Sequence, residues 1–285
     1  MTIKELMNRY KTVEKIKRGG QKTVYKATTS NGTVTALKIV NTETDQRILQ
    51  EIEIVRNLNN EHVPIIYETG TVFDEAVAEN AFYIVEEFIE GQSLRDYLDE
   101  GKRFSLTEAF SLAYALLDIE VHLEKKSILH RDINPSNIIL GKNNNIYLID
   151  FGIAKNLNGV SLTLASATHG PFTPGYAPYE QFANLRNTQD VRTDLFQIGV
   201  TIYEACTGKN PFKEANDNWL QAIIHTQTIM QKPLVMSGDN VGFFSQFIDM
   251  LMAKNQSQRP ENAETAMRYL MSIKSTLNLE ERGDT

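Results

Sequence analysis

A charged loop between two apolar segments, at Ser127–Leu140, limits most strongly what this chain can fold into. Apolar residues precede three consecutive polar ones, His130, Arg131 and Asp132, and the segment then becomes apolar again. Pro135 excludes a regular helix or strand in between, because proline lacks a backbone donor and fixes φ. We interpret the segment as the end of a buried strand, a charged loop and a return into a second strand.

A second segment of the same design follows at Ile146–Gly152, where an apolar strand ends in Asp150. Two such loops can place Asp132, Asn137 and Asp150 around one point. Carboxylate and amide oxygens of this kind suit Mg²⁺, which takes few protein ligands and keeps water and phosphate oxygens. The alternative is two ordinary strand-to-loop turns that happen to contain acids.

At these residues the chain resembles the eukaryotic-type serine/threonine protein kinases, whose catalytic motif H-R-D with a later Asn is followed by D-F-G. The first motif is present as His130, Arg131 and Asp132 with Asn137 at the family's spacing, and the second as Asp150, Phe151 and Gly152. One triplet would be weak evidence, whereas two motifs in order are specific. The resemblance covers residues 10–273.

The resemblance implies an α+β, bilobal protein-kinase fold. We expect residues 1–88 to form a small N-lobe, with an antiparallel sheet and one helix. Residues 89–275 would form a larger, mainly helical C-lobe, and residues 276–285 a polar tail. The chain length of 285 residues suits such a two-lobed unit. The acidic run at 73–80 is interpreted as a hairpin tip between two strands, and apolar residues at helical spacing predict further helices over 106–125, 241–253 and 261–274.

Composition narrows the class of protein and its partners. Apolar residues make up 41% and charged residues 23%, as in ordinary globular proteins. The net charge is −7 and no long basic run occurs, which argues against nucleic acid as a partner. We expect no membrane span, and the single cysteine, Cys206, favours a reducing, cytoplasmic setting.

A lysine in a strand and a glutamate on the next helix form a further candidate pair. Residues 10–40 alternate in the manner of strands, and Lys38 falls in the third of these. Apolar residues at helical spacing predict a helix over 43–58, which carries Glu51. By resemblance, Lys38 contacts the ATP phosphates and pairs with Glu51. The alternative for Glu51 is a solvated helix charge.

The glycine-rich turn before this lysine departs from the family pattern. Aligned on Val24, the three glycine positions fall on Lys17, Gly19 and Lys22, with Gly20 beside the retained glycine. Glycine is needed where backbone approaches phosphate closely. We hypothesise that Lys22 brings its ammonium to the phosphates instead; the alternative is a side chain that points to solvent.

The segment Ala81–Gly91 resembles the kinase hinge, which binds adenine through backbone groups. The alignment assigns this role to Glu87 and Ile89. The gatekeeper position, usually apolar, is then Glu86, whose buried carboxylate would find a partner or stay protonated. A shift of one residue would make Val85 the gatekeeper. Three further residues would sandwich the adenine: Val24, Ala36 and Ile139.

By resemblance, Asp132 accepts the proton of the incoming hydroxyl, while Asn137 and Asp150 hold Mg²⁺, or Mn²⁺ in its place. Asn134 stands where serine/threonine kinases usually carry a lysine, so an uncharged donor faces the γ-phosphate. His130 and Phe151 would stack in the apolar column that joins the lobes. Asp194, at the start of a predicted helix over 193–208, would bond backbone amides of the catalytic loop.

Residues 150–180 resemble the kinase activation segment, which ends here at Glu180. The resemblance implies that Glu180 pairs with Arg259 and that Thr173 bonds the catalytic aspartate. Arg131 often marks kinases controlled by phosphorylation of this segment. The candidate phosphosites are Thr163, Ser166 and Thr168, with solvated loop hydroxyls as the alternative.

Together these features predict an ATP- and Mg²⁺-dependent protein serine/threonine kinase that also autophosphorylates, with a homodimer as one arrangement for that step. The main alternative is a nucleotide-binding pseudokinase, favoured by Lys17, Lys22, Asn134 and Glu86. A second alternative is a small-molecule phosphotransferase of related fold, but such enzymes usually lack the long activation segment. A third is a tyrosine kinase, whose pattern matches this catalytic loop less well than that of a serine/threonine kinase.

Overall fold

The structure is a computed structural model that describes residues 1–18, 22–40, 52–151, 172–183, 185 and 188–279. The described residues form two compact units. The first is Met1–Glu90, and the second comprises Gly91–Phe151 and the described residues from Phe172 onward. Several sequence predictions lie outside the described residues: those on Gly19, Gly20, Glu51, Gly152, Thr163, Ser166 and Thr168.

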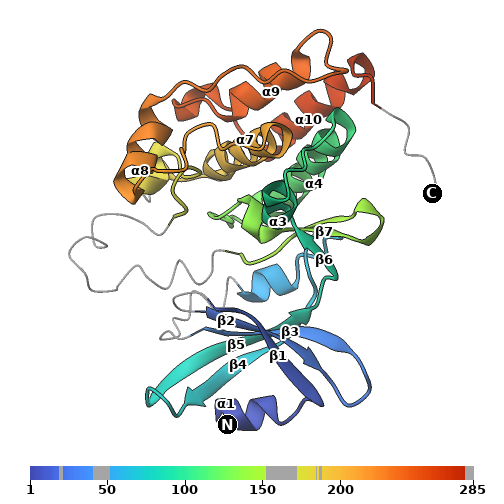
Figure 1. Ribbon diagram of the computed structural model, residues 1–285, viewed down its shortest axis with the longest axis vertical. Coiled ribbons are helices and arrows are strands. Elements are labelled where there is room, and N and C mark those ends of the chain that lie inside the picture. The colour runs from blue at the N-terminus through green and yellow to red at the C-terminus, as the bar shows by residue number, and fades with distance from the viewer. Residues whose placement is uncertain (19–21, 41–51, 152–171, 184, 186–187, 280–285) are drawn as a thin grey trace. The chain divides into compact units, whose positions relative to one another are not determined.

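The first unit is built on a five-stranded antiparallel sheet with the strand order β1-β2-β3-β5-β4 (Figure 1). β4 and β5 are joined by a tight turn at 75–78, which confirms the hairpin tip that the acidic run predicts. Residues 52–56 are helical. The strands are β1 (Thr12–Arg18), β2 (Lys22–Thr28), β3 (Val34–Val40), β4 (Ile66–Asp74) and β5 (Glu79–Glu87).

One face of this sheet packs against the short helix α1 (Ile3–Met7). Leu6 of α1 is fully buried in a cluster with Leu37, Val85 and other sheet residues. Thr2 and Glu5 each bond the other's backbone N–H, so α1 begins with a capping box. Sequence analysis missed this helix, although Thr-x-x-Glu is the signature of such a start.

The second unit is mainly helical, with a small sheet of the order β6-β7-β8. Its strands are β6 (Gly91–Ser93), β7 (Ile138–Gly141) and β8 (Ile146–Leu148). Its α-helices are α3 (Leu94–Asp99), α4 (Leu106–Glu124), α6 (Tyr179–Phe182), α7 (Val191–Thr207), α8 (Trp219–Thr228), α9 (Phe243–Leu251) and α10 (Ala263–Ile273). Short 3₁₀ turns are η1 (Pro135–Asn137), η2 (Lys142–Asn144), η5 (Gln256–Gln258) and η6 (Lys274–Thr276).

Helix α7 is the centre of this unit, because it packs against α4, α9 and α10 and is buried along most of its length. It ends at Gly208, whose φ of 73° closes the helix in the left-handed conformation. The positive φ favours glycine at this position, because a side chain there would strain the backbone.

The helices predicted over 106–125, 193–208, 241–253 and 261–274 are confirmed as α4, α7, α9 and α10, within two residues at most ends. Helix α8 has no counterpart among the predictions. Across the ranges that the structure describes, no helix has both the length and the apolar character needed to cross a membrane.

Candidate active site

Side chains on one face of α7 hold the charged loop at 130–137. Asp194 accepts hydrogen bonds from the backbone N–H groups of His130 and Arg131, both at 2.7 Å, as the sequence predicts. Gln197, one helical turn later, accepts the N–H of Ile133 at 2.7 Å. Because residues three apart share a helix face, one buried helix fixes consecutive parts of the loop.

Arg131 lies at the most constrained point of this loop. Its φ of 65° is left-handed, a conformation that costs a residue other than glycine about 1–3 kcal/mol. Its carbonyl accepts hydrogen bonds from Gln181 at 2.7 Å and Gln197 at 3.2 Å, and its N–H donates to Asp194. Side chains therefore hold both of its peptide groups, which offsets the backbone strain.

Two side chains orient the carboxylate of Asp132. The hydroxyl of Thr173 donates to its Oδ1 at 2.5 Å, and the amide nitrogen of Asn137 donates to its Oδ2 at 3.0 Å. The same nitrogen donates to the backbone carbonyl of Asp132 at 2.8 Å. The Asn137 amide oxygen is consequently directed away from Asp132, and it is an atom type that Mg²⁺ prefers.

Asp150 and Phe151 follow β8 and are linked to this loop. Ile149 donates its backbone N–H to the carbonyl of Asn137 at 2.8 Å, which brings Asp150 next to the loop. Asp150 itself is left-handed, with φ of 62°. The ring centroids of Phe151 and His130 lie 4.9 Å apart.

The donor set fits a magnesium ion better than a transition metal. Among the described residues, no group of three or more His, Cys, Asp or Glu side chains could hold a metal. Asn137 and Asp150, the two ligands that the sequence predicts, offer oxygen atoms as donors. Mg²⁺ suits such a sparse set, because it retains water and phosphate oxygens.

Asn134 caps the turn η1. Its side-chain oxygen accepts the N–H of Ser136 at 3.0 Å, and its nitrogen donates to the carbonyl of Asp132 at 3.0 Å. Sequence analysis treated Asn134 as a phosphate contact and missed this capping role. An Asn directly before Pro135 is the signal that indicates it. Ile139, the candidate adenine contact, lies in β7.

In the first unit, the face of the sheet opposite α1 carries the candidate nucleotide residues. Val24 pairs with Lys38, and Ala36 pairs with Glu86, so all four side chains project from one face. Val85 projects from the opposite face into the cluster around Leu6. Glu86 is therefore the residue that shares the face of Lys38.

Lys38 and Glu86 form a buried ion pair. The Lys38 Nζ lies 2.5 Å from Glu86 Oε1, and the two residues are 5% and 8% exposed. They sit diagonally across β3 and β5, within reach for long side chains. The sequence analysis expected a buried Glu86 to find a partner, and the structure provides one. It did not predict that this partner would be Lys38.

Three further candidate residues flank this face. Lys22 begins β2, opposite Val40. Glu87 ends β5 and donates its backbone N–H to Ile65 at 2.8 Å, and Ile89 follows in the segment that leads to β6. Their predicted contacts with phosphate and adenine stay predictions.

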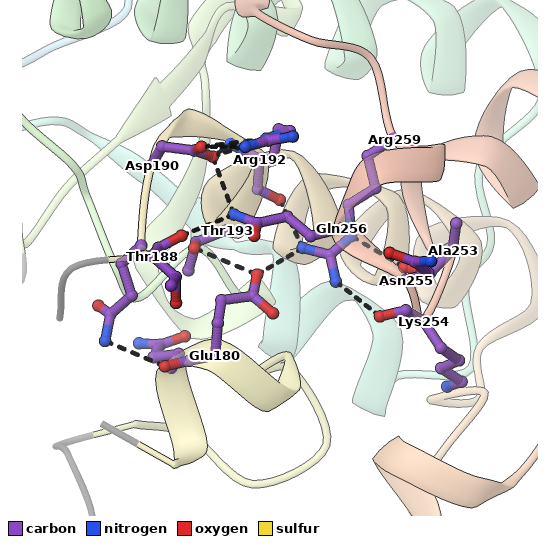
Figure 2. Close-up of polar contacts among 12 residues, drawn as sticks. Glu180, Thr188, Asp190, Arg192, Thr193, Ala253, Lys254, Asn255, Gln256 and Arg259 are labelled. Atoms are coloured by element: carbon purple, nitrogen blue, oxygen red, sulfur yellow. Dashed lines mark hydrogen bonds and ion pairs between the residues drawn. The ribbon is translucent and has the colours of Figure 1, made fainter. Parts of the chain in front are cut away.

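Figure 2 shows the second buried ion pair, Glu180 with Arg259, which the sequence predicts. Arg259 Nη1 lies 2.6 Å from Glu180 Oε1, and the residues are 4% and 5% exposed. Arg259 also donates to three backbone carbonyls, those of Arg192, Ala253 and Lys254. The pair joins α6 to the segment before α10 and so fixes the end of the activation segment.

Beneath the loop, two acids are buried together on α4 and α7. Burial raises the pKa of Asp194 to about 6, against the opposing effect of its bonds from Arg131 and His130. Burial, and then the negative charges of Asp194 and Glu124, raise the pKa of Glu120 well above its ordinary 4.5. Neither Glu120 oxygen makes a hydrogen bond within the described part of the chain. We infer that Glu120 holds a proton at neutral pH and that Asp194 is ionised.

Comparison with known proteins agrees with this geometry. Residues 10–271 match the family described as protein kinase domain. This chain belongs to the protein kinase family. Recognition of a eukaryotic-type serine/threonine kinase catalytic domain from its motifs is therefore confirmed, as is the fold class of an antiparallel-sheet unit and a mainly helical unit.

Relatives of this kinase domain include a probable serine/threonine-protein kinase of Clostridium perfringens, 29% identical over 98% of the chain. The Arabidopsis thaliana serine/threonine-protein kinase RUNKEL is 30% identical over 90% of the chain. The Bacillus subtilis serine/threonine-protein kinase PrkC is 28% identical over 73%. The matches span 40%, 18% and 32% of these relatives' own lengths, so the chain corresponds to less than half of each.

Replacing Arg259 should destabilise the kinase domain strongly. Arg259→Ala leaves Glu180 buried without its cation, which costs about 3–5 kcal/mol. Arg192→Ala removes the neighbouring, more exposed partner of Asp190 and should cost about 1 kcal/mol or less. Urea denaturation of both variants checks this, and equal losses would contradict the assigned importance of the buried pair.

Glu120 should make stability depend on pH. Its folded pKa is raised, so above pH 4.5 the unfolded chain releases this proton first and the free energy of unfolding falls as pH rises. Glu120→Gln cannot ionise and should become progressively more stable than wild type above that pH. Urea denaturation between pH 4.5 and 8 tests this, with the exposed Glu261→Gln as control. A difference that stays constant across the range would rule it out.

Proposed function

We propose that this kinase domain is an ATP- and Mg²⁺-dependent protein serine/threonine kinase that also phosphorylates itself. The observation that carries the proposal is the Asp132 carboxylate, held by Thr173 and Asn137 on a loop locked to α7. Family membership and the serine/threonine kinase names of its relatives support it.

In the proposed mechanism, Asp132 accepts the proton of a serine or threonine hydroxyl as that oxygen attacks the γ-phosphorus of ATP, and the bond from this phosphorus to the bridging oxygen breaks and releases ADP. Lys38 contributes its ammonium to the α and β phosphates. Asn137 and Asp150 would hold Mg²⁺ or Mn²⁺, which would supply positive charge to neutralise the triphosphate. Catalysis rests on positioning and charge complementarity, because no residue forms a covalent intermediate.

The pseudokinase alternative rests on Lys22, Asn134 and Glu86, which replace residues that the family usually carries. The residues with chemical roles argue against it, because Lys38, Asp132, Asn137 and Asp150 are all present. Their geometry within each unit supports an active enzyme.

The proposal also includes how the kinase is regulated and where in the cell it acts. A phosphate added at Thr163, Ser166 or Thr168 would pair with Arg131 and order the activation segment. Self-phosphorylation between two copies gives a transient homodimer. Dependence on ATP and the single cysteine favour the cytoplasm.

Substitutions in the proposed machinery should strongly slow phosphate transfer, and those at Asp132 and Asp150 should do so without unfolding the protein. Asp132→Asn should slow it by about 10²–10⁴-fold, because the proton acceptor is lost. Lys38→Met and Asp150→Asn should also be strongly impaired, whereas the exposed Glu75→Gln keeps wild-type activity. Labelled ATP, mass spectrometry of the product and thermal melting check these outcomes. Turnover that survives Asp132→Asn and Asp150→Asn unchanged would reject the proposal.

A further inference from the structure

A cavity of about 1040 Å³ lies beside the catalytic loop, entirely within the second unit. Asn134 and Thr173 line it, and both bond Asp132. The cavity extends past α3 and the end of α7 to residues 208–215. Its volume reaches the upper limit of about 300–1,000 Å³ for small-molecule pockets, which suits a polypeptide segment bound next to Asp132.

The buried acid of this cavity is already satisfied. Glu204 is 4% exposed, and Arg95 donates to its Oε1 at 2.5 Å, while the Tyr176 hydroxyl donates to its Oε2. Burial, and then the charge of Glu204, raise the pKa of Tyr176, so this hydroxyl stays a donor. Arg95 also pairs with Asp99 at 3.2 Å. Two of the lining acids therefore share one internal cation.

Three exposed lysines remain at the rim: Lys209, Lys213 and Lys232. Within the described ranges, none of the three makes an ion pair with a carboxylate, although Lys213 lies close enough to Asp217 to act on it: the backbone bond of Glu214, then His225 and the charge of Lys213, lower the pKa of Asp217. Glu214 is the acid of the lining that Arg95 does not neutralise. The rim is consequently basic, in a chain whose net charge is −7.

We propose that this cavity, the acidic-substrate groove, binds a substrate segment with Asp or Glu side chains within a few residues of the acceptor hydroxyl. The lysines attract these carboxylates, and Arg95 prevents Glu204 from attracting basic residues. The inference rests on the proposed kinase function and adds the chemical class of the substrate to it.

The test uses three fluorescein-labelled peptides with one serine and identical sequences, except that flanking positions carry Glu, Gln or Lys. The acidic peptide should bind and react about tenfold better than the Gln peptide, since three exposed charge pairs act together. This advantage should shrink at high salt, because exposed charges are screened. Anisotropy gives Kd, and labelled ATP gives kcat/KM.

Replacement of the three rim lysines by Gln should make the Kd and kcat/KM values of the acidic peptide nearly equal to those of the Gln peptide. A matched triple variant, with Lys4, Lys11 and Lys15 replaced by Gln, removes the same charge elsewhere and should keep the wild-type ratio. Arg95→Leu releases Glu204 and should improve binding of the Lys peptide.

Two results separate the two proposals. Equal Kd values for the acidic and neutral peptides, or tighter binding of the Lys peptide by wild type, would overturn the acidic-substrate groove. Absence of phosphate transfer to every peptide would overturn the kinase proposal, while the Kd values still decide the groove.

A second, independent observation concerns the Lys38–Glu86 ion pair. Its carboxylate is supplied by a strand of the same sheet, paired residue by residue with β3. An ammonium has three donors, so a bond to Glu86 does not prevent a bond to a phosphate oxygen. We infer that Glu86 is a positioning residue, which fixes Lys38 from the sheet itself. This inference also rests on the proposed function.

Glu86→Gln should raise the KM for ATP and lower kcat/KM by about tenfold, because a bond to a charged partner is lost. The KM for peptide should not change, and Glu86→Asp should recover part of the loss. The control is Glu79→Gln, an exposed acid at the other end of β5. If Glu86→Gln lowers the melting temperature but leaves the KM for ATP unchanged, the ion pair stabilises the fold and does not position Lys38 for ATP. An inactive wild type would instead reject the kinase proposal.

Discussion

The two hydrogen bonds from the catalytic-loop backbone to the Asp194 carboxylate are the interaction on which the second unit depends. They fix the loop just before Asp132, at a residue whose left-handed backbone would otherwise be costly. Both bonds are short and the Asp194 carboxylate is fully buried, so water has little access to this acceptor. Gln197 and Gln181 then complete the backbone hydrogen bonding of Arg131 by donating to its carbonyl. The packing of α7 in the core therefore keeps the catalytic loop in place at the proposed reaction centre.

Buried acids are satisfied in four different ways in this molecule. Glu180 has a guanidinium, Glu86 an ammonium, and Asp194 two backbone amides. Glu120 has none of these within the described residues, and its raised pKa indicates that a proton neutralises it. In each case burial would favour the neutral form, and the partner decides whether charge is kept. The three acids with a partner each orient something: Asp194 the catalytic loop, Glu86 the Lys38 side chain, and Glu180 the end of the activation segment.

The sequence supported prediction where the signal is local or belongs to a motif. Apolar periodicity located α4 and α7, and the motif spacing led to the Asp194 contacts and the Glu180–Arg259 pair. Contacts that depend on strand register were not predictable. Glu86 was known to need a partner, but its contact with Lys38 requires the pairing of β3 with β5, about fifty positions apart in the chain. Nor could composition show that Arg95 neutralises Glu204, since helix packing brings them together.

The attachment of the loop to α7 also governs how the protein loses order. Three loop amides, those of His130, Arg131 and Ile133, are protected by side chains of a core helix rather than by a neighbouring strand. Local fraying cannot release them individually, because their acceptors do not move unless α7 itself separates from α4 and α9. The loop and the core helix therefore belong to one cooperative opening unit. Exchange of these amides with solvent would require the rare event that dismantles the whole helical unit, so the proposed catalytic geometry persists for as long as the fold does.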